Sequence, residues 1–359
     1  MKRVKKWVPN LILLLFAIII HFLSDNTIWI EKYYSTGIYP YISTSLMYLL
    51  GWLPFSVGDL FYGVIVIWLI YTIAQLLRFC RNNSISAGKL PISGIKSFKW
   101  LLLIYIFFNV LWGINYNRRG IASQLGLRLE KYKPEDLRII DSILLNKVNS
   151  GKRAILQKRQ YSVSTRLLKE GTKDAYQNIS IRYPFLANHP TSIKPSLWGW
   201  LGNYLGFMGY YNPFTGEAQV NTTVPQFLQP YVFCHETAHQ LGYAKEDEAN
   251  FVGYLAATAS TDTFFHYSTY LDLFLYAQRN LYKADSFAVK DFASQLLPEV
   301  KADLHEWSQF NKRHKNPVEP VVRWIYSKYL INNQQPAGEL SYNEVTGLLI
   351  AYYKKFGKI

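Results

Sequence analysis

Long apolar runs recur through the first third of the chain and are separated by polar or charged stretches. Three of these runs, residues 7–23, 60–77 and 100–116, approach the roughly 20 residues that a membrane-spanning helix needs. Each run carries tryptophan or tyrosine near an end, as helices anchored at a membrane surface do. One such run could form a buried core helix, but three so close together predict three membrane spans.

A fourth apolar stretch, residues 41–59, is short and is interrupted by Gly51 and Pro54. It predicts an interfacial or re-entrant helix rather than a further span. The basic residues before the first span are typical of a signal peptide, but no small-residue cleavage site follows the apolar run. We therefore expect the first span to remain in the mature protein.

The distribution of lysine and arginine predicts the orientation in the membrane. The N-terminal tail holds four basic residues and residues 78–99 hold five without an acid, whereas residues 24–59 hold one lysine and three acids. The positive-inside rule then predicts a multi-pass protein of the cytoplasmic (inner) membrane with a cytoplasmic N-terminus. The chain after the third span is extracytoplasmic, or periplasmic. Arg118 and Arg119 do not fit this orientation, but long domains cross a membrane largely regardless of charge.

Residues 118–359 have the composition of a water-soluble domain and follow a membrane domain of residues 1–117. Strand character is concentrated in residues 204–222, where two runs of aromatic or β-branched residues flank a turn at residues 212–216. We expect an α+β fold, mostly helical and zincin-like, with a small sheet beside a histidine-bearing helix. Helical patterns begin at Pro134 and cover residues 163–178, 261–280, 286–297, 298–311, 320–331 and 341–355.

The formal charge of +15 suits contact with an anionic partner. The lysines are scattered and no nucleic-acid motif accompanies them, so we expect membrane lipid as a partner and no nucleic acid. The two cysteines, Cys80 and Cys234, do not imply a disulfide framework. Cys234 adjoins the histidine motif on another face of its helix, where a small buried hydrophobic residue is expected.

His235, Glu236 and His239 fit the motif H-E-x-x-H. Residues four apart share one face of a helix, so both imidazoles can reach a single Zn²⁺. Glu236 lies about 100° around the helix from His235, where it can face a metal-activated water instead of the metal. It would act there as general base and then as general acid.

Zinc in a catalytic site needs a third protein ligand. The metzincin pattern would place it at Lys245, which is a cation, and no methionine follows the motif, so that pattern is excluded. Glu246 and Glu248 are the candidates, and on a second helix they point about 200° apart, so that only one can face the zinc. Asn250 shares a face with Glu246 and could hydrogen-bond a ligating histidine, which favours Glu246.

His235-Glu236-x-x-His239 followed by Glu246-x-x-Ala249-Asn250 resembles the gluzincin pattern. The resemblance implies that Glu246 is the third ligand and that Asn250 supports the site. The separation of His239 from Glu246 is much shorter than in thermolysin-like gluzincins. Over nearly its full length the chain also resembles a bacterial family of three-span membrane proteins of unknown function.

A peptidase of this kind also needs a donor for the oxyanion that forms at the scissile carbonyl. His266, Tyr267 and Tyr270 follow on the next predicted helix, and the two tyrosines are the stronger candidates. The chain has 28 tyrosines, so core packing is the competing role for each of them. The predicted hairpin at residues 204–222 could present an edge strand to an extended peptide or could merely cover the core.

These features predict a zinc metallopeptidase tethered outside the cytoplasmic membrane, with a peptide or protein substrate. Two other functions keep the metal: a zinc-stabilised envelope scaffold without proteolysis, and a zinc-dependent hydrolase of a cell-wall amide. Glu236 argues against the scaffold, because structural zinc needs no general base. A site within the membrane is disfavoured, because Gln226, Gln229 and Gln240 flank the motif and no long apolar run contains it.

Overall fold

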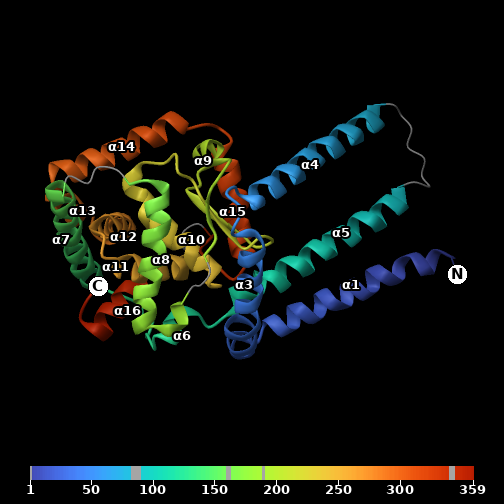
Figure 1. Cartoon of the computed structure of the whole chain (residues 1–359), viewed down its shortest axis with the longest axis horizontal. Helices are drawn as coiled ribbons and strands as arrows, with labels where there is room; N and C mark the ends of the chain where they lie inside the picture. The colour runs from blue at the N-terminus through green and yellow to red at the C-terminus, as the bar shows by residue number, and fades with distance from the viewer. Residues whose placement is uncertain (1, 82–89, 159–162, 188–190, 339–343) are drawn as a thin grey trace.

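The computed structural model consists of a helical body with an arm of three long helices on one side (Figure 1). The arm contains α1 (Lys2–Ser24), α4 (Val57–Arg81) and α5 (Leu90–Leu111). The structure describes residues 2–81, 90–158, 163–187, 191–338 and 344–359. Residues 82–89, which form part of the loop predicted to be cytoplasmic, therefore lie outside the described residues.

Two described helices are long and apolar enough to cross a membrane, through the segments Trp7–Ser24 and Val57–Gln75. A third apolar segment, Ser97–Leu111, is shorter. The large apolar side chains of α1 and α4 are mostly exposed, as expected for helices in lipid rather than in a protein core. These two helices indicate that the chain is anchored in a membrane.

The predicted end of the third apolar run, at residue 116, is wrong. The helix α5 ends at Leu111, and the next residues form the short 3₁₀ helix η2 (Gly113–Asn117) inside the body. Apolar composition alone could not separate these positions, because residues facing lipid and residues buried in protein look alike in a sequence. The segment joins a second buried cluster, whose residues come from both sides of the predicted boundary between the membrane domain and the soluble domain. The cluster consists of Ile30, Tyr34, Tyr39, Trp112, Ile114, Tyr116, Tyr211 and Ala244.

The helix α3 (Tyr39–Leu50) crosses the base of the arm instead of running along it (Figure 1). It follows α2 (Thr27–Trp29) and the π-helix η1 (Ile30–Ile38). Its inner side, which includes Tyr39, is buried against the body, while its outer side is exposed and apolar. Residues 41–50 of the stretch predicted at 41–59 thus form most of the short, separate helix α3, whereas its last residues, from Val57 on, begin α4.

The helices predicted for the body are confirmed to within a few residues at their ends. The body also contains short helices that the sequence did not reveal, namely α6 (Gly120–Gln124), α9 (Gly199–Leu205), η3 (Pro184–Leu186) and η4 (Gln226–Leu228). The confirmed helices are α7 (Pro134–Lys158), α8 (Thr165–Arg182), α12 (Thr263–Ala284), α13 (Ser286–Ser294), α14 (Pro298–His314), α15 (Glu319–Asn332) and α16 (Val345–Phe356).

The predicted hairpin is confirmed as β2 (Gly209–Asn212) and β3 (Glu217–Val220), which pair antiparallel. The turn between them closes because the Asn212 side-chain oxygen accepts a hydrogen bond from the Phe214 amide at 3.0 Å. A further strand, β1 (Ile193–Pro195), pairs parallel to β3, so the sheet order is β1-β3-β2. The fold is therefore mostly helical with a small three-stranded sheet.

The helix α10 (Gln229–Gln240) occupies the centre of the body, and every one of its residues is buried. It packs against α11 (Glu246–Thr258), α12 and β3. The buried position of Cys234 agrees with its expected role as a small hydrophobic residue. A helix that is surrounded on all sides fixes the direction of each side chain, and this helix carries the H-E-x-x-H motif.

Candidate metal centre

Two successive helices carry the motif and the acids that follow it. Pro230 lies in the first turn of α10, where a helix loses no hydrogen bond to proline. The chain reverses at Gly242, whose φ of +80° a residue with a side chain rarely adopts. A β-carbon there would also lie 2.9 Å from the ring of Tyr39. The tight turn lets α11 begin at Glu246, beside the histidine face of α10.

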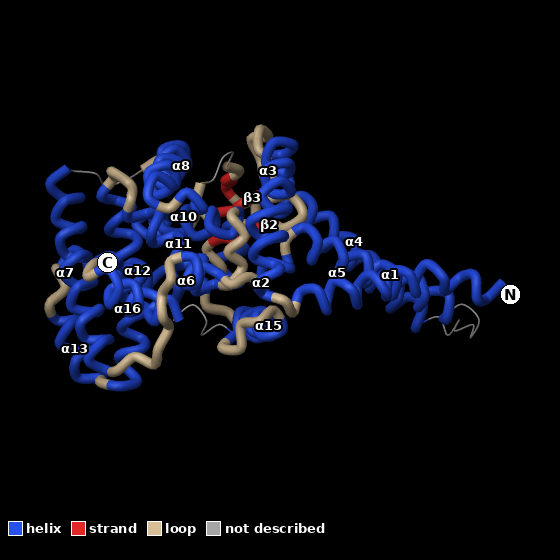
Figure 2. The backbone as a smooth tube through the Cα atoms, turned by 90° about the horizontal axis from the view of Figure 1, so that it is seen from below, coloured by secondary structure: helices blue, strands red, loops and turns tan. Residues whose placement is uncertain are grey.

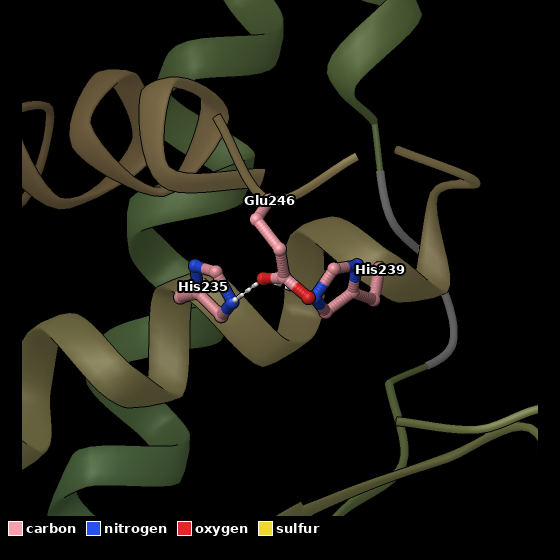
Figure 3. Close-up of side chains that lie close together, drawn as sticks. All are labelled: His235, His239 and Glu246. Carbon is pink, nitrogen blue, oxygen red and sulfur yellow. Dashed lines mark ion pairs between the residues drawn. The ribbon is translucent and has the colours of Figure 1, made fainter. Parts of the chain in front are cut away.

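His235, His239 and Glu246 converge on one point (Figure 3). Oε2 of Glu246 lies 3.3 Å from Nε2 of His235 and 3.6 Å from Nε2 of His239. Two ligand atoms at about 2.1 Å from a tetrahedral ion are about 3.4 Å apart. The spacing of the three buried side chains therefore fits a single metal ion.

The charges in the group also fit a cation. Burial alone would raise the pKa of Glu246, but the two neighbouring imidazoles hold it well below its ordinary value. Burial alone would lower the pKa of His235, but Glu246 and Glu236 raise it. Within the described part of the chain, Oε2 of Glu246 makes no hydrogen bond. A buried carboxylate oxygen that is ionised and makes no hydrogen bond is well suited to ligate a positive ion.

A hydrogen bond behind the His239 imidazole orients that ring. The Nδ1 atom of His239 lies 2.7 Å from the carbonyl oxygen of Tyr243. Because a carbonyl can only accept, Nδ1 carries the proton and Nε2 presents its lone pair to the centre. Asn250, the residue that the gluzincin resemblance implied as a supporting partner, contributes to raising the pKa of His235.

Glu236 is buried beside the three residues without being one of them. Its Oε2 atom makes no hydrogen bond among the described residues. Burial raises the pKa of Glu236 to about 7, although the nearby His235 and His239 lower it. A β-carbon on Gly209 would lie 2.5 Å from Oε1, so the first residue of β2 rests directly against this carboxyl group. Glycine at this position leaves room for the carboxyl group beside an edge strand.

Two residues near the C-terminus contact Glu246 and were not found from the sequence. The Tyr326 hydroxyl on α15 donates a hydrogen bond to Oε1 of Glu246 at 2.6 Å. The side-chain oxygen of Gln335 accepts a hydrogen bond from the Glu246 amide at 3.0 Å. Neither has a recognisable spacing from the motif, because both are about 80 or more residues downstream.

Residues from the N-terminal part of the chain bind the last carbonyl groups of α10 and its turn. Tyr39 and Ser43 on α3 donate to the carbonyl of Gln240 at 3.1 and 2.9 Å. The Trp112 indole donates to the carbonyl of His239 at 3.3 Å. Arg118, discounted above as a topology signal, forms a buried ion pair with Glu31 and donates to the carbonyl of Gly242 at 3.1 Å. These contacts satisfy carbonyls that the end of a helix leaves without partners.

The other predicted candidates lie outside the three-residue group. Glu248 faces the other way and lies against Gly120, where a β-carbon would overlap its carboxyl group. The Tyr267 hydroxyl donates to Asp303 on α14. Tyr270 packs with His266, whose Nε2 lies 2.8 Å from the carbonyl of Ser260.

The two tyrosines contact other parts of the core, and their role as oxyanion donors stays a prediction. The part of α12 that contains them packs against α7, where Gly151 touches the backbone of Tyr267. A lysine on α7 also lies over the Tyr267 ring, with its Nζ 5.2 Å from the ring centre. Both tyrosines thus serve the core between α12 and α7.

No curated protein and no solved structure matches this chain. A family model described as "Protein of unknown function (DUF3810)" matches residues 34–350. These residues include α3, the arm helices α4 and α5, and almost all of the body. Because the match covers most of the 359 residues, the protein belongs to this DUF3810 family.

Proposed function

We propose that this protein is a zinc metallopeptidase anchored in the cytoplasmic membrane, with its body on the outer side. The arm helices α1, α4 and α5 are its three spans, and the basic residues at their predicted cytoplasmic ends set the orientation. His235, His239 and Glu246 hold the ion. The observation that carries the proposal is their convergence at spacings of 3.3 and 3.6 Å beside an unbonded carboxyl oxygen of Glu236.

Zinc, when bound, polarises a scissile carbonyl and makes a water molecule acidic enough to attack it near neutral pH. Glu236 accepts the proton of that water and passes it to the leaving nitrogen. Burial raises the pKa of Glu236 above the ordinary value of a carboxyl group, which makes it a stronger base for the proton of the water. Tyr326 positions the ligand Glu246 and has no further chemical role in this proposal.

The three-residue centre favours a peptidase over an envelope scaffold. A structural zinc site uses four protein ligands, whereas a catalytic site uses three and keeps one position open. Among the described residues, the group of metal-binding side chains contains three. The edge strand β2 lies beside Glu236, where an extended peptide could add to the sheet. These features also suit hydrolysis of a cell-wall amide, which the substrate test below distinguishes.

The test uses the full-length protein in nanodiscs, its zinc content, and a library of quenched fluorogenic peptides. We expect wild type to hold one zinc ion and to cleave peptides. Glu236→Gln should keep the zinc and lose activity by about 10²- to 10⁴-fold, the usual contribution of a general acid–base group. His239→Ala should lose both.

Zinc-loaded wild type that cleaves no peptide, together with identical behaviour of Glu236→Gln, would identify the scaffold instead. Release of amides from purified cell wall, with no cleavage of peptides, would identify the wall hydrolase. In either case the ligand residues would stand while the peptidase proposal would fall.

A further inference from the structure

The helix α15 covers the candidate metal centre but is poorly buried. Leu330 is the one buried residue of this helix. Val321, Trp324 and Ile325 are 55%, 62% and 57% exposed, and Nζ of the exposed Lys328 lies 6.0 Å from the centre of the Trp324 ring. A short helix with little burial and exposed apolar side chains beside a lysine needs a partner for those side chains to be stable in this position. The surface that this partner must cover extends beyond α15 to neighbouring parts of the body.

Contacts with the arm place α15 at the membrane end of the body. The ring of Tyr329 on α15 lies 6.4 Å from that of Phe108 in the apolar part of α5. Its hydroxyl is 3.1 Å from that of Tyr116, just after α5. Figures 1 and 2 both show α15 at the base of the arm, level with α3.

The neighbouring helix α9 reaches the same level. The Trp198 indole donates to the carbonyl of Asp59, at 3.0 Å, in the first turn of α4. A β-carbon on Gly63, one turn further along α4, would lie 3.1 Å from the Trp198 ring. Next to this contact, Leu197 and Trp200 are 47% and 59% exposed. Exposed tryptophans at the start of a membrane helix are typical of the membrane–water interface.

The candidate metal centre lies at this same end of the molecule. The ring of Trp112, the first residue after α5, is 6.0 Å from the ring of the ligand His239. The cover over Glu246 is formed by Tyr326, on the helix whose outer face is apolar. A substrate that displaces this cover must therefore arrive at the surface from which the arm emerges.

We infer that the apolar faces of α9 and α15 rest in the outer lipid leaflet, and that the centre cleaves membrane-anchored polypeptides close to the bilayer. The second part rests on the proposed peptidase function and names its substrate class. A polypeptide held by its own anchor reaches the covered centre from the membrane surface, at which α15 and Tyr326 lie.

The first experiment measures the lipid contact and needs no enzymatic activity. A spin label is placed at position 324 or 200 by Trp324→Cys or Trp200→Cys, with Cys80 replaced by Ser and the buried Cys234 retained. The matched control is Phe287→Cys, because Phe287 is 82% exposed on α13, far from the arm (Figure 1). The proteins are placed in nanodiscs of phosphatidylethanolamine and phosphatidylglycerol.

We expect labels at 324 and 200 to be accessible to oxygen, which dissolves in lipid, and protected from a water-soluble nickel chelate. The label at 287 should show the opposite pattern. A label at 324 that is as accessible to the chelate as the label at 287 would overturn the lipid contact.

The second experiment measures the substrate class with the same nanodiscs. One quenched fluorogenic peptide library is prepared in three forms: without an anchor, with a palmitoyl anchor and a short spacer, and with the anchor and a long Gly/Ser spacer. We expect Glu236-dependent cleavage of the short-spacer form to be at least about tenfold faster than that of the other two forms.

The long-spacer form controls for mere concentration at the membrane, which both anchored forms share. Equal Glu236-dependent rates for the short- and long-spacer forms, or for the unanchored form, would overturn the substrate class and leave the peptidase standing. Absence of Glu236-dependent cleavage in every form would instead overturn the proposed function, while the spin labels would still decide the lipid contact.

Discussion

The two sides of the candidate metal centre are held in opposite ways. On one side, α10 and α11 carry the three converging residues, and every residue of α10 is buried. On the other side, α15 reaches Glu246 through one tyrosine and buries one residue of its own. Local stability follows burial, so we expect the ligand side to be the rigid half and α15 to be the half that opens at low cost. The centre thus combines deeply buried ligands with a sparsely buried cover.

The largest effect should come from removing a ligand on the rigid side. Glu246→Gln should weaken zinc binding by more than the roughly 10- to 100-fold that a supporting hydrogen bond contributes. Its matched control is Glu248→Gln, which changes the neighbouring buried acid that faces Gly120. Titration of the purified proteins with zinc measures both affinities. If Glu248→Gln loses zinc and Glu246→Gln retains it, the convergence seen here does not describe the ligand set.

The next effect tests the turn that joins the two rigid helices. Gly242→Ala should destabilise the fold by about 2–4 kcal/mol, because an alanine at φ +80° is strained and its β-carbon would meet the Tyr39 ring at 2.9 Å. Gly357→Ala is the control, since Gly357 has a φ of +69° but nothing within 4 Å of its β-carbon position. Chemical denaturation in detergent gives the difference. Equal losses would show that the contact with α3 contributes nothing.

A smaller effect is expected on the movable side. Tyr326→Phe removes the hydroxyl that donates to Glu246 and should weaken zinc binding by about 10- to 100-fold. Tyr329→Phe removes a hydroxyl from the same helix that faces Tyr116 instead, and should leave zinc affinity unchanged. If both variants bind zinc as tightly as wild type does, the assigned role of Tyr326 is wrong.

The comparison with the smallest effect on the metal centre sets Glu246 against a buried carboxyl group that has no imidazole beside it. Burial raises the pKa of Asp141, on α7, from its ordinary 3.8 to about 7, whereas the pKa of Glu246 is lowered. Folded protein then binds more protons at Asp141 than unfolded protein does between about pH 4 and 7. The contribution of Asp141 to stability is therefore full below about pH 4 and is lost as pH rises to about 7.

Asp141→Asn should remove this loss, which amounts to about 4 kcal/mol for a pKa of about 7 in place of 3.8. The unfolding temperature of the variant should fall less than that of wild type as the pH rises through this range. Asp174→Asn, at an exposed position on α8, should follow wild type. If Asp141→Asn also follows wild type, burial does not perturb Asp141.

The features that could be predicted from the sequence are those that local patterns determine. The spacing of His235 and His239 sets a shared helix face whatever the rest of the chain does. The hairpin around Asn212 is likewise a local feature, because its turn closes on its own side chain. Glu246 could be favoured over Glu248 because the two differ in direction on one short helix.

Contacts between segments that are far apart in the sequence could not be predicted in this way. Tyr326 is one of 28 tyrosines, and nothing in its surroundings marks the one whose hydroxyl meets Glu246. Tyr267 was proposed for the site because its helix follows the motif, but the rotation of a long helix against α7 decides which of its faces meets the centre. The predicted third span included Trp112 and ran on to residue 116, because a sequence records hydrophobicity and not what surrounds each residue.

The carbonyl groups at the end of α10 have a consequence for how the protein can be regulated. Those carbonyls accept hydrogen bonds from the side chains of Tyr39, Ser43, Trp112 and Arg118. All four residues precede α7, the first long helix of the body. A protease that clipped the chain after Arg118 would release a fragment whose motif helix ends in bare acceptors. We therefore expect that cleavage after Arg118 weakens the metal centre of the released fragment.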